Sequence, residues 1–334
     1  MLPTANIGRL VAAAAQQSRH AEVVAVASRD GERARAFADE LGITTSYASY
    51  DEMLVSAEID AVYVALPVSM HTEWTLRALK AGKHVLCEKP FTTSPVAAAQ
   101  CFDAAERSGV VCAEGLMYRY HPQTLRAQQL IADGVIGRLA TIRAALSITA
   151  GPGDIRRSVE LGGGALGDLG CYCVSAIRLF AGEPERVYAT QVPDGPGGVD
   201  LRLAATLSMP GDVLAQFDVG LDLTRRDELE LIGTEGKLTI PDPWLCRAGY
   251  LELERDGVSE RLPVDPGGGH VIADPELDAY RIELDAVSAA ILDVAPLTFG
   301  RDDAVAQASA LDALLRSSNA ESPVRVREPG KDLA

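Results

Sequence analysis

One stretch of the sequence, Ile59–Phe91, constrains the fold more than any other. Its apolar run Ala61–Leu66 has the length of a strand that is covered on both faces, and Pro67 ends it. His71–Lys80 then has helical spacing, and His84–Cys87 is a second apolar strand. A strand, a helix and a strand in so short a stretch predict a right-handed βαβ unit. Ligands of such sheets bind at the carboxyl ends of the strands.

The same alternation of strands and helices continues up to residue 113. A helix is expected from Asn6 to Arg19, a buried strand over Glu22–Ser28, and a helix capped by Asp30 that ends before Gly42. Ser94 is expected to cap a further helix, with proline at its first position. The sequence therefore predicts an α/β domain, residues 1–113, with a doubly wound parallel sheet of the Rossmann type.

The pattern changes after residue 113. Runs with strand character follow one another without helices between them, at 186–191, 199–209, 212–221, 227–232, 236–240 and 249–254. Such a succession predicts a largely antiparallel, open sheet and an α+β second domain, residues 114–334. Two helices, near 276–293 and 302–317, end this part of the chain, and an alternative is that they pack back on the first domain.

Composition and charge exclude several classes of partner. The chain has 334 residues, 47% hydrophobic and 23% charged, which is ordinary for a globular protein with two domains. Its formal net charge of −16 argues against nucleic acid and anionic membranes as partners. Neither a membrane-spanning apolar run nor an apolar leader after Met1 is found, so we expect a cytoplasmic protein.

Cysteine and histidine usage agrees with that location. The six cysteines include no C-x-x-C pair, and we expect reduced, mostly buried thiols. The five histidines are scattered without ligand spacing, so no metal site is predicted.

Ser28 ends the strand expected over Glu22–Ser28 and Arg29 follows it, at the place where an acidic residue would accept the ribose hydroxyls of NAD. A hydroxyl followed by a guanidinium suits a 2′-phosphate instead, and Arg33 can add to it. Asp30 is simply the cap of the next helix. These residues favour NADP over NAD, and the alternative is that both arginines lie on a solvated surface.

A glycine-rich stretch, Gly162–Tyr172, is expected to open a helix from Ala165 to Phe180. Asp168 and Tyr172 are four residues apart, so on an α-helix they share one face. A phenol beside a carboxylate can serve as a general acid or base with its orienting partner. Taken alone, the pair is better explained by a contact within one helix.

Several motifs in order resemble the Gfo/Idh/MocA family, named for glucose-fructose oxidoreductase, inositol dehydrogenase and a rhizopine-catabolism protein. The similarity covers nearly the whole chain. The motifs are Ala5-Asn6-Ile7-Gly8, Val26-Ala27-Ser28-Arg29-Asp30, Glu88-Lys89-Pro90, Met117-Tyr118-Arg119-Tyr120-His121-Pro122, Gly162-Gly163-Gly164 with Asp168 and Tyr172, and Gly233-Thr234-Glu235-Gly236.

The resemblance implies roles for individual residues. Lys89 would bind the reacting hydroxyl or carbonyl and hold positive charge near Tyr172, Tyr172 would exchange the proton, and Asp168 would position the substrate. Because the reference pKa of a phenol is about 10, a neighbouring ammonium is needed for useful base strength near neutral pH. Further positions would line the cofactor, namely Leu66, Pro67, His71 and Glu88. Arg119 and Arg157 are weaker candidates for substrate contact.

The sequence departs from the family pattern at its beginning. In the family, a strand and a glycine-rich turn precede the first helix. Here that turn falls on Pro3-Thr4-Ala5-Asn6-Ile7-Gly8, which makes Thr4, Ala5, Asn6 and Ile7 the expected cofactor-binding residues. Of the three glycines, only Gly8 is present. Before Pro3, only Met1 and Leu2 correspond to the first, central strand of the family pattern. The strands on either side of this short strand would then keep backbone amide and carbonyl groups without hydrogen-bond partners. We expect either a start placed several residues too late or a truncated copy.

Val68, where relatives often carry Asn, removes one polar contact to the cofactor.

The resemblance predicts an NADP-preferring oxidoreductase that acts on a sugar or another cyclic polyol. Aldose oxidation, keto-sugar reduction and trans-dihydrodiol oxidation all remain open, and a homodimer or homotetramer is expected. One alternative is a non-catalytic binding or partner subunit, which Pro3 favours. Another is NAD-dependent glycoside cleavage, which Tyr rather than His at position 172 argues against.

Overall fold

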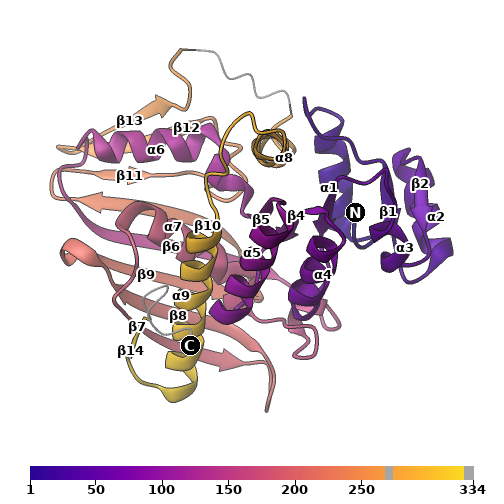
Figure 1. The fold of residues 1–334 in the computed structure, drawn as a ribbon. Helices are drawn as coiled ribbons and strands as arrows, with labels where there is room; N and C mark the ends of the chain where they lie inside the picture. Colours follow the sequence, from indigo (N-terminus) through magenta and orange to yellow (C-terminus); the bar gives the residue numbers. More distant parts are fainter. Residues whose placement is uncertain (268–273, 327–334) are drawn as a thin grey trace. The chain divides into compact units, whose positions relative to one another are not determined.

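The computed structural model describes residues 1–267 and 274–326, which divide into two compact units (Figure 1). The first unit comprises residues 1–117 and 274–305, and the second comprises the remaining described residues, 118–267 and 306–326. The boundary expected at residue 113 lies close to the end of the first segment. The chain returns to the first unit after residue 273.

The first unit alternates strands and helices. Its elements are α1 (Asn6–Ala15), β1 (Ala25–Ala27), α2 (Gly31–Leu41), β2 (Thr45–Tyr47), α3 (Tyr50–Leu54), β3 (Ala61–Val64), α4 (Val68–Lys80), β4 (His84–Glu88), α5 (Pro95–Ser108), β5 (Cys112–Gly115) and α8 (Asp278–Ile291). All strand pairs are parallel: β1 pairs with β2, β3 with β4, and β4 with β5. The predicted doubly wound parallel sheet is thereby confirmed.

Met1 and Leu2 lie between β1 and β3 and take the place of a central strand. The Met1 amino group donates a hydrogen bond to the Ala25 carbonyl at 2.7 Å, and Leu2 bridges to Val64 in parallel. Both residues are buried. We expected the neighbours of the first strand to lack hydrogen-bond partners. They lack them only in part, because Met1 and Leu2 connect β1-β2 with β3-β4-β5.

Local signals in the sequence explain several helix ends. Asp30 accepts a hydrogen bond from the Arg33 amide and begins α2, and Gly42 ends it in the left-handed conformation with φ 68°. Ser94 likewise caps α5 through the Ala97 amide, with Pro95 at the first helical position. These three predictions are confirmed. The first helix ends at Ala15, short of the predicted Arg19.

The second unit is built on one nine-stranded sheet. Its elements are α6 (Pro122–Ala132), β6 (Leu139–Thr149), α7 (Cys171–Ala181), β7 (Arg186–Pro193), β8 (Asp200–Ser208), β9 (Leu214–Gly220), β10 (Asp222–Gly233), β11 (Lys237–Thr239), β12 (Tyr250–Arg255), β13 (Val258–Pro263), α9 (Arg301–Ala320), which begins in the first unit, and β14 (Val324–Arg325). The strand order is β13-β12-β11-β10-β6-β9-β8-β7-β14. Within this nine-stranded sheet, β6 and β9 are the one parallel pair among the described residues, so the sheet is largely antiparallel, as predicted.

One face of this sheet is covered by helices. Burial alternates along β8 and β9, as expected for strands with one buried face. On the buried face α7 packs against β6, and the Gln307 side chain of α9 donates to the Cys171 carbonyl at 2.8 Å. The Ser317 hydroxyl, also on α9, accepts from the Ala189 amide of β7. The opposite face carries the polar positions of the alternation.

The glycine-rich stretch corrects one prediction. A π-helical turn, Leu166–Gly170, precedes α7, where a continuous α-helix from Ala165 was expected. Two glycines in this stretch lower the stability of an ordinary α-helix, which is consistent with the change.

Candidate active site

Three strand ends of the first unit bring predicted site residues to the same edge of its parallel sheet. Ser28 and Arg29 follow β1, Leu66 and Pro67 follow β3, and Glu88-Lys89-Pro90 ends β4. Ser28 and Leu66 are buried, Lys89 is half-buried, and Arg29 is exposed. This edge is where open parallel sheets bind their ligands.

The turn that carries Lys89 is held by two carboxylates. Glu88 accepts a hydrogen bond from the Tyr63 hydroxyl of β3 and another from the Lys89 amide, at 3.2 Å. Glu114 on β5 accepts from the Phe91 amide at 2.8 Å. Burial and the nearby Glu88 carboxylate together raise the pKa of Tyr63 well above its ordinary value. Tyr63 therefore remains a hydroxyl donor to Glu88, and the backbone at Lys89 is fixed from both sides.

His71 lies inside α4 and joins two of the strand ends. Its Nε2 is 2.7 Å from the Leu66 carbonyl and its Nδ1 is 3.0 Å from the Pro90 carbonyl. The ring is buried, and burial lowers its pKa. The side chain thus positions the turns before α4 and after Lys89. It does not cap the start of the helix, because Pro67 stands at that position.

Sequence reasoning missed a buried carboxyl beside this turn. Glu283 on α8 is 3% exposed, and its Oε1 makes no hydrogen bond within the described structure. Burial raises its pKa well above the ordinary value, and the charges of Glu88 and Glu114 act in the same direction. The residue lies far along the chain from Lys89, and nothing in the sequence around it distinguishes it from a surface glutamate.

The end of β1 has the features expected for a phosphate site. The Ser28 hydroxyl accepts from the Asp30 amide at 3.2 Å, while Asp30 itself caps α2, as predicted. Arg29 and Arg33 are both exposed. Burial raises the pKa of the nearby Tyr50 hydroxyl, and the positive charges of the two arginines oppose that shift. Both guanidinium groups therefore lie near Tyr50, and Arg29 directly follows Ser28 in the chain.

The start of α1 can accept a pyrophosphate. Thr4 and Ala5 precede the helix, Asn6 and Ile7 form its first positions, and no side chain of the described residues caps this turn. The first amide groups of such a helix are free donors toward an anion, and the helix dipole adds to the attraction. These amides at α1 and the arginines after β1 together fit a dinucleotide with a 2′-phosphate.

In the second unit, Asp168 lies in the π turn and is paired with an arginine. The Arg156 Nε donates to its Oδ2 at 2.8 Å, and Arg156 also contacts Asp154 at 3.2 Å. The glycines before the turn allow this arrangement. A Cβ at Gly163 would lie 2.3 Å from the Arg156 carbonyl, and one at Gly164 would lie 2.1 Å from the Asp200 carboxylate. No larger residue fits at either position without a shift of the backbone or of Asp200.

Tyr172 lies on α7 within an aromatic cluster. Its ring centroid is 6.0 Å from that of Tyr118 and 5.8 Å from that of Trp244, and the latter two rings meet edge to face at 5.7 Å. The Trp244 indole donates to the Ala145 carbonyl at 3.3 Å. The cluster holds the phenol on a rigid surface. Trp244 lies in an irregular segment, and its place beside Tyr172 could not be predicted from local sequence.

The two arginines predicted as weaker substrate contacts have partners in the protein. Arg119 is buried, and its Nε donates to the Ser175 hydroxyl at 2.7 Å. Arg157 forms a two-bond contact with Asp194, both bonds 2.6 Å long. The arginine that contacts Asp168 is Arg156, the neighbour of Arg157. The sequence does not show which of these two adjacent arginines makes that contact.

Asp200 gives a stability prediction for this part of the structure. Its Oδ2 accepts from the Leu166 amide at 2.6 Å, and burial raises its pKa from 3.8 to about 6. The folded state therefore binds more protons than the unfolded state between these values, and stability falls as pH rises through them. We expect Asp200→Asn, which keeps an acceptor for the amide, to raise the free energy of unfolding at pH 7 by about 2–3 kcal/mol. At pH 4 the variant should equal the parent in denaturant titrations.

Asp194→Asn is the matched control for that measurement. Arg157 lowers the pKa of Asp194, so this carboxylate stabilises the fold above its unfolded pKa and its loss should lower stability at pH 7. If both variants shift stability in the same direction at pH 7, the assignment of Asp200 is wrong.

Comparisons with known proteins agree with this arrangement. Residues 4–116 match the model of an oxidoreductase family with an NAD-binding Rossmann fold, GFO_IDH_MocA, and residues 124–239 match the C-terminal domain of the same family. A D-xylose 1-dehydrogenase (NADP(+)) of Haloferax volcanii is 36% identical, with 98% of each chain covered. A trans-1,2-dihydrobenzene-1,2-diol dehydrogenase of Danio rerio is 34% identical over 73% of each chain.

A solved structure shows the same fold. It is that of KijD10, a 3-ketoreductase from Actinomadura kijaniata, in complex with NADP and TDP-benzene. This protein is 31% identical, its TM-score is 0.85, and the match covers 94% of the present chain and 95% of KijD10.

Proposed function

The chain belongs to the Gfo/Idh/MocA oxidoreductase family, and we propose that it transfers a hydride reversibly between NADP and a sugar or another cyclic polyol. The observation that carries this proposal is the gathering of Ser28-Arg29, Leu66-Pro67 and Glu88-Lys89 at one edge of the parallel sheet. Relatives of the same family named for sugar and dihydrodiol substrates support the class of reaction.

We propose NADP rather than NAD as the preferred cofactor. Ser28, Arg29 and Arg33 would bind the 2′-phosphate, because guanidinium groups form strong, charge-assisted bonds to phosphate. The first amides of α1, after Thr4 and Ala5, would bind the pyrophosphate. The nicotinamide supplies or accepts the hydride when the cofactor is bound.

Lys89, Tyr172 and Asp168 would carry the remaining chemistry. In the direction of reduction, Tyr172 would give its proton to the carbonyl oxygen when the bound nicotinamide supplies a hydride to the carbonyl carbon, so that an alcohol would form. In the direction of oxidation, Tyr172 takes the hydroxyl proton as the hydride leaves. Lys89 donates a hydrogen bond to the reacting oxygen and stabilises the charge that develops there. Asp168 positions the substrate through a neighbouring hydroxyl.

The contacts within each unit support these roles. The backbone at Lys89 is fixed by Glu88, which limits the positions its ammonium can take. Asp168 keeps a guanidinium partner in Arg156, which holds its carboxylate in place as an acceptor of sugar hydroxyls. Tyr172 is 8% exposed within its aromatic cluster, so the reacting proton is shielded from bulk water.

The direct test of the cofactor proposal is a titration of the purified chain with NADPH and, separately, NADH, followed by tryptophan fluorescence and calorimetry. We expect micromolar NADPH binding and much weaker NADH binding. A folded protein that binds neither dinucleotide would contradict the proposed function. Equal affinity for the two would contradict the assignment of Ser28 and Arg29.

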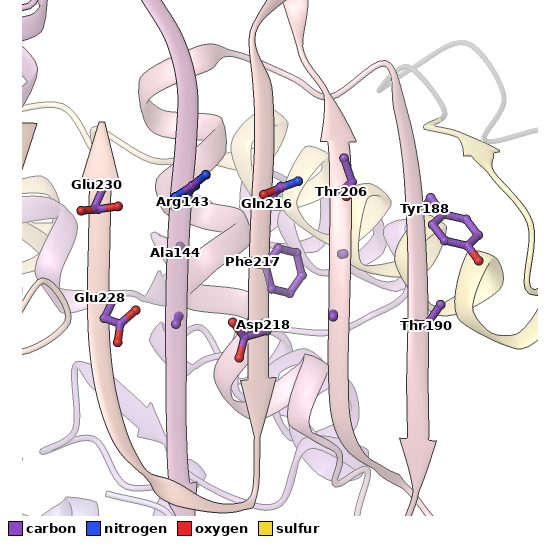
Figure 2. Close-up of a pocket in the computed structure, with 13 residues that line it drawn as sticks. Arg143, Ala144, Tyr188, Thr190, Thr206, Gln216, Phe217, Asp218, Glu228 and Glu230 are labelled. Atoms are coloured by element: carbon purple, nitrogen blue, oxygen red, sulfur yellow. The ribbon is translucent and has the colours of Figure 1, made fainter. Parts of the chain in front are cut away.

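We further propose that the open face of the nine-stranded sheet joins two or more copies of the chain. Two rows of side chains cross this face in register (Figure 2). The first row is Glu230, Arg143, Gln216, Thr206 and Tyr188, and the second is Glu228, Ala145, Asp218, Ala204 and Thr190. Small residues in the second row leave a hollow of about 490 Å³.

Apolar side chains support an interface at this face. Tyr188, Val192 and Leu214 are at least 40% exposed on outward positions of β7 and β9. We expect light scattering to give twice or four times the 35.4 kDa of one chain. Leu214→Glu should lower that mass, because it places a charge in the interface, whereas Val258→Glu on β13 should not. A parent chain that is monomeric at micromolar concentration would contradict this proposal.

We also propose a cytoplasmic location. All six cysteines are free and buried, which agrees with a reducing compartment. In the part of the chain that the structure describes, no helix is both long enough and apolar enough to span a bilayer.

A further inference from the structure

One face of α8 carries a carboxyl among buried residues. Tyr280, Glu283, Val287 and Ala290 are all buried, and their spacing of three or four residues places them on the same side of the helix. The Oε1 atom of Glu283 makes no hydrogen bond within the described residues. A buried carboxyl without a partner destabilises a fold, so the groups around Glu283 indicate what it binds.

The helix α8 runs in the opposite direction to β4. Near the end of α8, Ile291 and Leu292 line one hollow with His84, the first residue of β4. Nearer its start, Glu283 feels the charge of Glu88, the last residue of β4. Glu283 therefore lies beside the carboxyl ends of the parallel strands, at the edge that also carries the Lys89 turn.

The charged groups that act on Glu283 within the described residues are carboxylates. Burial raises the pKa of Glu283, and the charges of Glu88 and, less strongly, Glu114 raise it further. Tyr63 is close as well, but its hydroxyl already donates to Glu88. An ionised carboxylate only accepts hydrogen bonds, so it would face two other acceptors here. A protonated carboxyl instead carries the donor that these neighbours can accept.

Glu88 is the acceptor nearest in effect to Glu283, and it also holds the Lys89 turn. Its Oε1 accepts from the Tyr63 hydroxyl, and its Oε2 accepts from the Lys89 amide at 3.2 Å. A carboxylate offers about four acceptor positions, which admits a further donor. The last torsion of a glutamate side chain is soft, so the acid of Glu283 can turn toward Glu88 at low cost.

We propose that Glu283 is a positioning residue for Lys89, because its carboxylic acid donates a hydrogen bond to the Glu88 carboxylate. The inference rests on the proposed function, in which Lys89 binds the reacting oxygen. The bond from Glu283 holds the Glu88 side chain in the place where it accepts from the Lys89 amide. Glu283 itself exchanges no proton with the substrate, and it acts only through the turn.

Two variants of Glu283 separate its donor from its volume. Glu283→Gln keeps a donor on a side chain of the same length, whereas Glu283→Met keeps the length without a donor. We expect Glu283→Met to lower kcat for reduction of a keto-sugar by NADPH about ten- to a hundredfold, because a loosened turn misplaces Lys89. Glu283→Gln should keep kcat within a few-fold of the parent value. The midpoint of thermal unfolding should not fall in Glu283→Met, since an apolar side chain replaces a buried carboxyl.

Two further measurements need no substrate. Hydrogen exchange at the Lys89 amide should be faster than in the parent in Glu283→Met, and unchanged in Glu283→Gln. The infrared spectrum of the parent at pH 7 should contain the carbonyl stretch of a protonated carboxylic acid that is missing from the spectrum of Glu283→Gln. Both results remain informative if the parent shows no activity, an outcome that would contradict the proposed function and not the role of Glu283 in the turn.

Asp285→Asn is the matched control on the same helix. Asp285 accepts from the Ser18 hydroxyl at 2.6 Å and from Arg281 at 3.1 Å, so its loss should leave kcat and the exchange of the Lys89 amide unchanged. Parent-like exchange at Lys89 in Glu283→Met would overturn the proposal. So would a loss of kcat in Glu283→Gln as large as that in Glu283→Met, or identical infrared spectra of the parent and Glu283→Gln in the region of protonated carboxyls.

Discussion

Tyr172→Phe is expected to lower kcat for hydride transfer by a factor of about 10²–10⁴, the usual contribution of a positioned general acid or base. The substitution removes only the hydroxyl, so the ring contacts with Tyr118 and Trp244 remain. NADPH affinity should stay within a few-fold of the parent value, because the proposed cofactor residues lie elsewhere in the sequence. Steady-state kinetics with the best substrate of a sugar screen measures the effect.

A matched control removes a phenol that has no proposed role. Tyr250→Phe on β12 keeps the ring beneath Arg261, whose guanidinium lies 4.2 Å from the ring centroid, and should leave kcat unchanged. Lys89→Met should resemble Tyr172→Phe in its loss of kcat. If Tyr172→Phe keeps full activity while Lys89→Met loses it, the proton is exchanged by another group.

The double variant Arg29→Ala, Arg33→Ala is expected to weaken NADPH binding by a factor of about 10²–10³. Each charge-assisted bond to the 2′-phosphate contributes about 1.5–3 kcal/mol, and NADH lacks that phosphate. NADH affinity should therefore change little, and the preference for NADPH should disappear. Calorimetric titration with each dinucleotide gives both constants.

Arg35→Ala controls for the loss of charge from the same helix. Arg35 is exposed on α2 and pairs with Glu32 at 2.5 Å, so it has a partner within the helix. Its replacement should leave NADPH binding almost unchanged. Should the double variant weaken NADPH and NADH by the same factor, Arg29 and Arg33 would contribute general attraction and not recognition of the phosphate.

Local signals predicted the first unit well. The run Ala61–Leu66, the cap at Asp30 and the Ser94-Pro95 start each depend on a few neighbouring residues. Both caps form as expected, and the run forms a strand that ends at Val64, two residues early. The parallel pairing of the strands followed from the alternation of strands and helices, because parallel neighbours need a crossover between them. The same βαβ pattern placed Lys89 at a strand end, and the family resemblance gave it a role.

Other features depend on contacts that local sequence does not encode. The π turn at Asp168 depends on Gly163 and Gly164, which fit against the Arg156 carbonyl and the Asp200 carboxylate. Asp200 is far from the turn along the chain. Glu283 approaches Glu88 and Glu114 only because the chain returns to the first unit after residue 273.

At the start of the chain, one feature could be predicted from the sequence and another could not. Sequence analysis predicted that the neighbours of a short first strand would keep unpaired groups, and the structure shows pairing through Met1 and Leu2 alone. The burial of the Met1 amino group could not be predicted, because it depends on how closely β1 and β3 enclose two residues.

The most direct test of the central claim follows the hydride itself. The chain is mixed with a panel of keto-sugars and NADPH that carries deuterium at the hydride position of the nicotinamide, and the products are analysed by mass spectrometry. We predict that a sugar product gains one deuterium on carbon, and that Tyr172→Phe and Lys89→Met abolish most of this transfer. A folded chain that binds NADPH but transfers no deuterium to any sugar or cyclic diol in either direction would contradict the account.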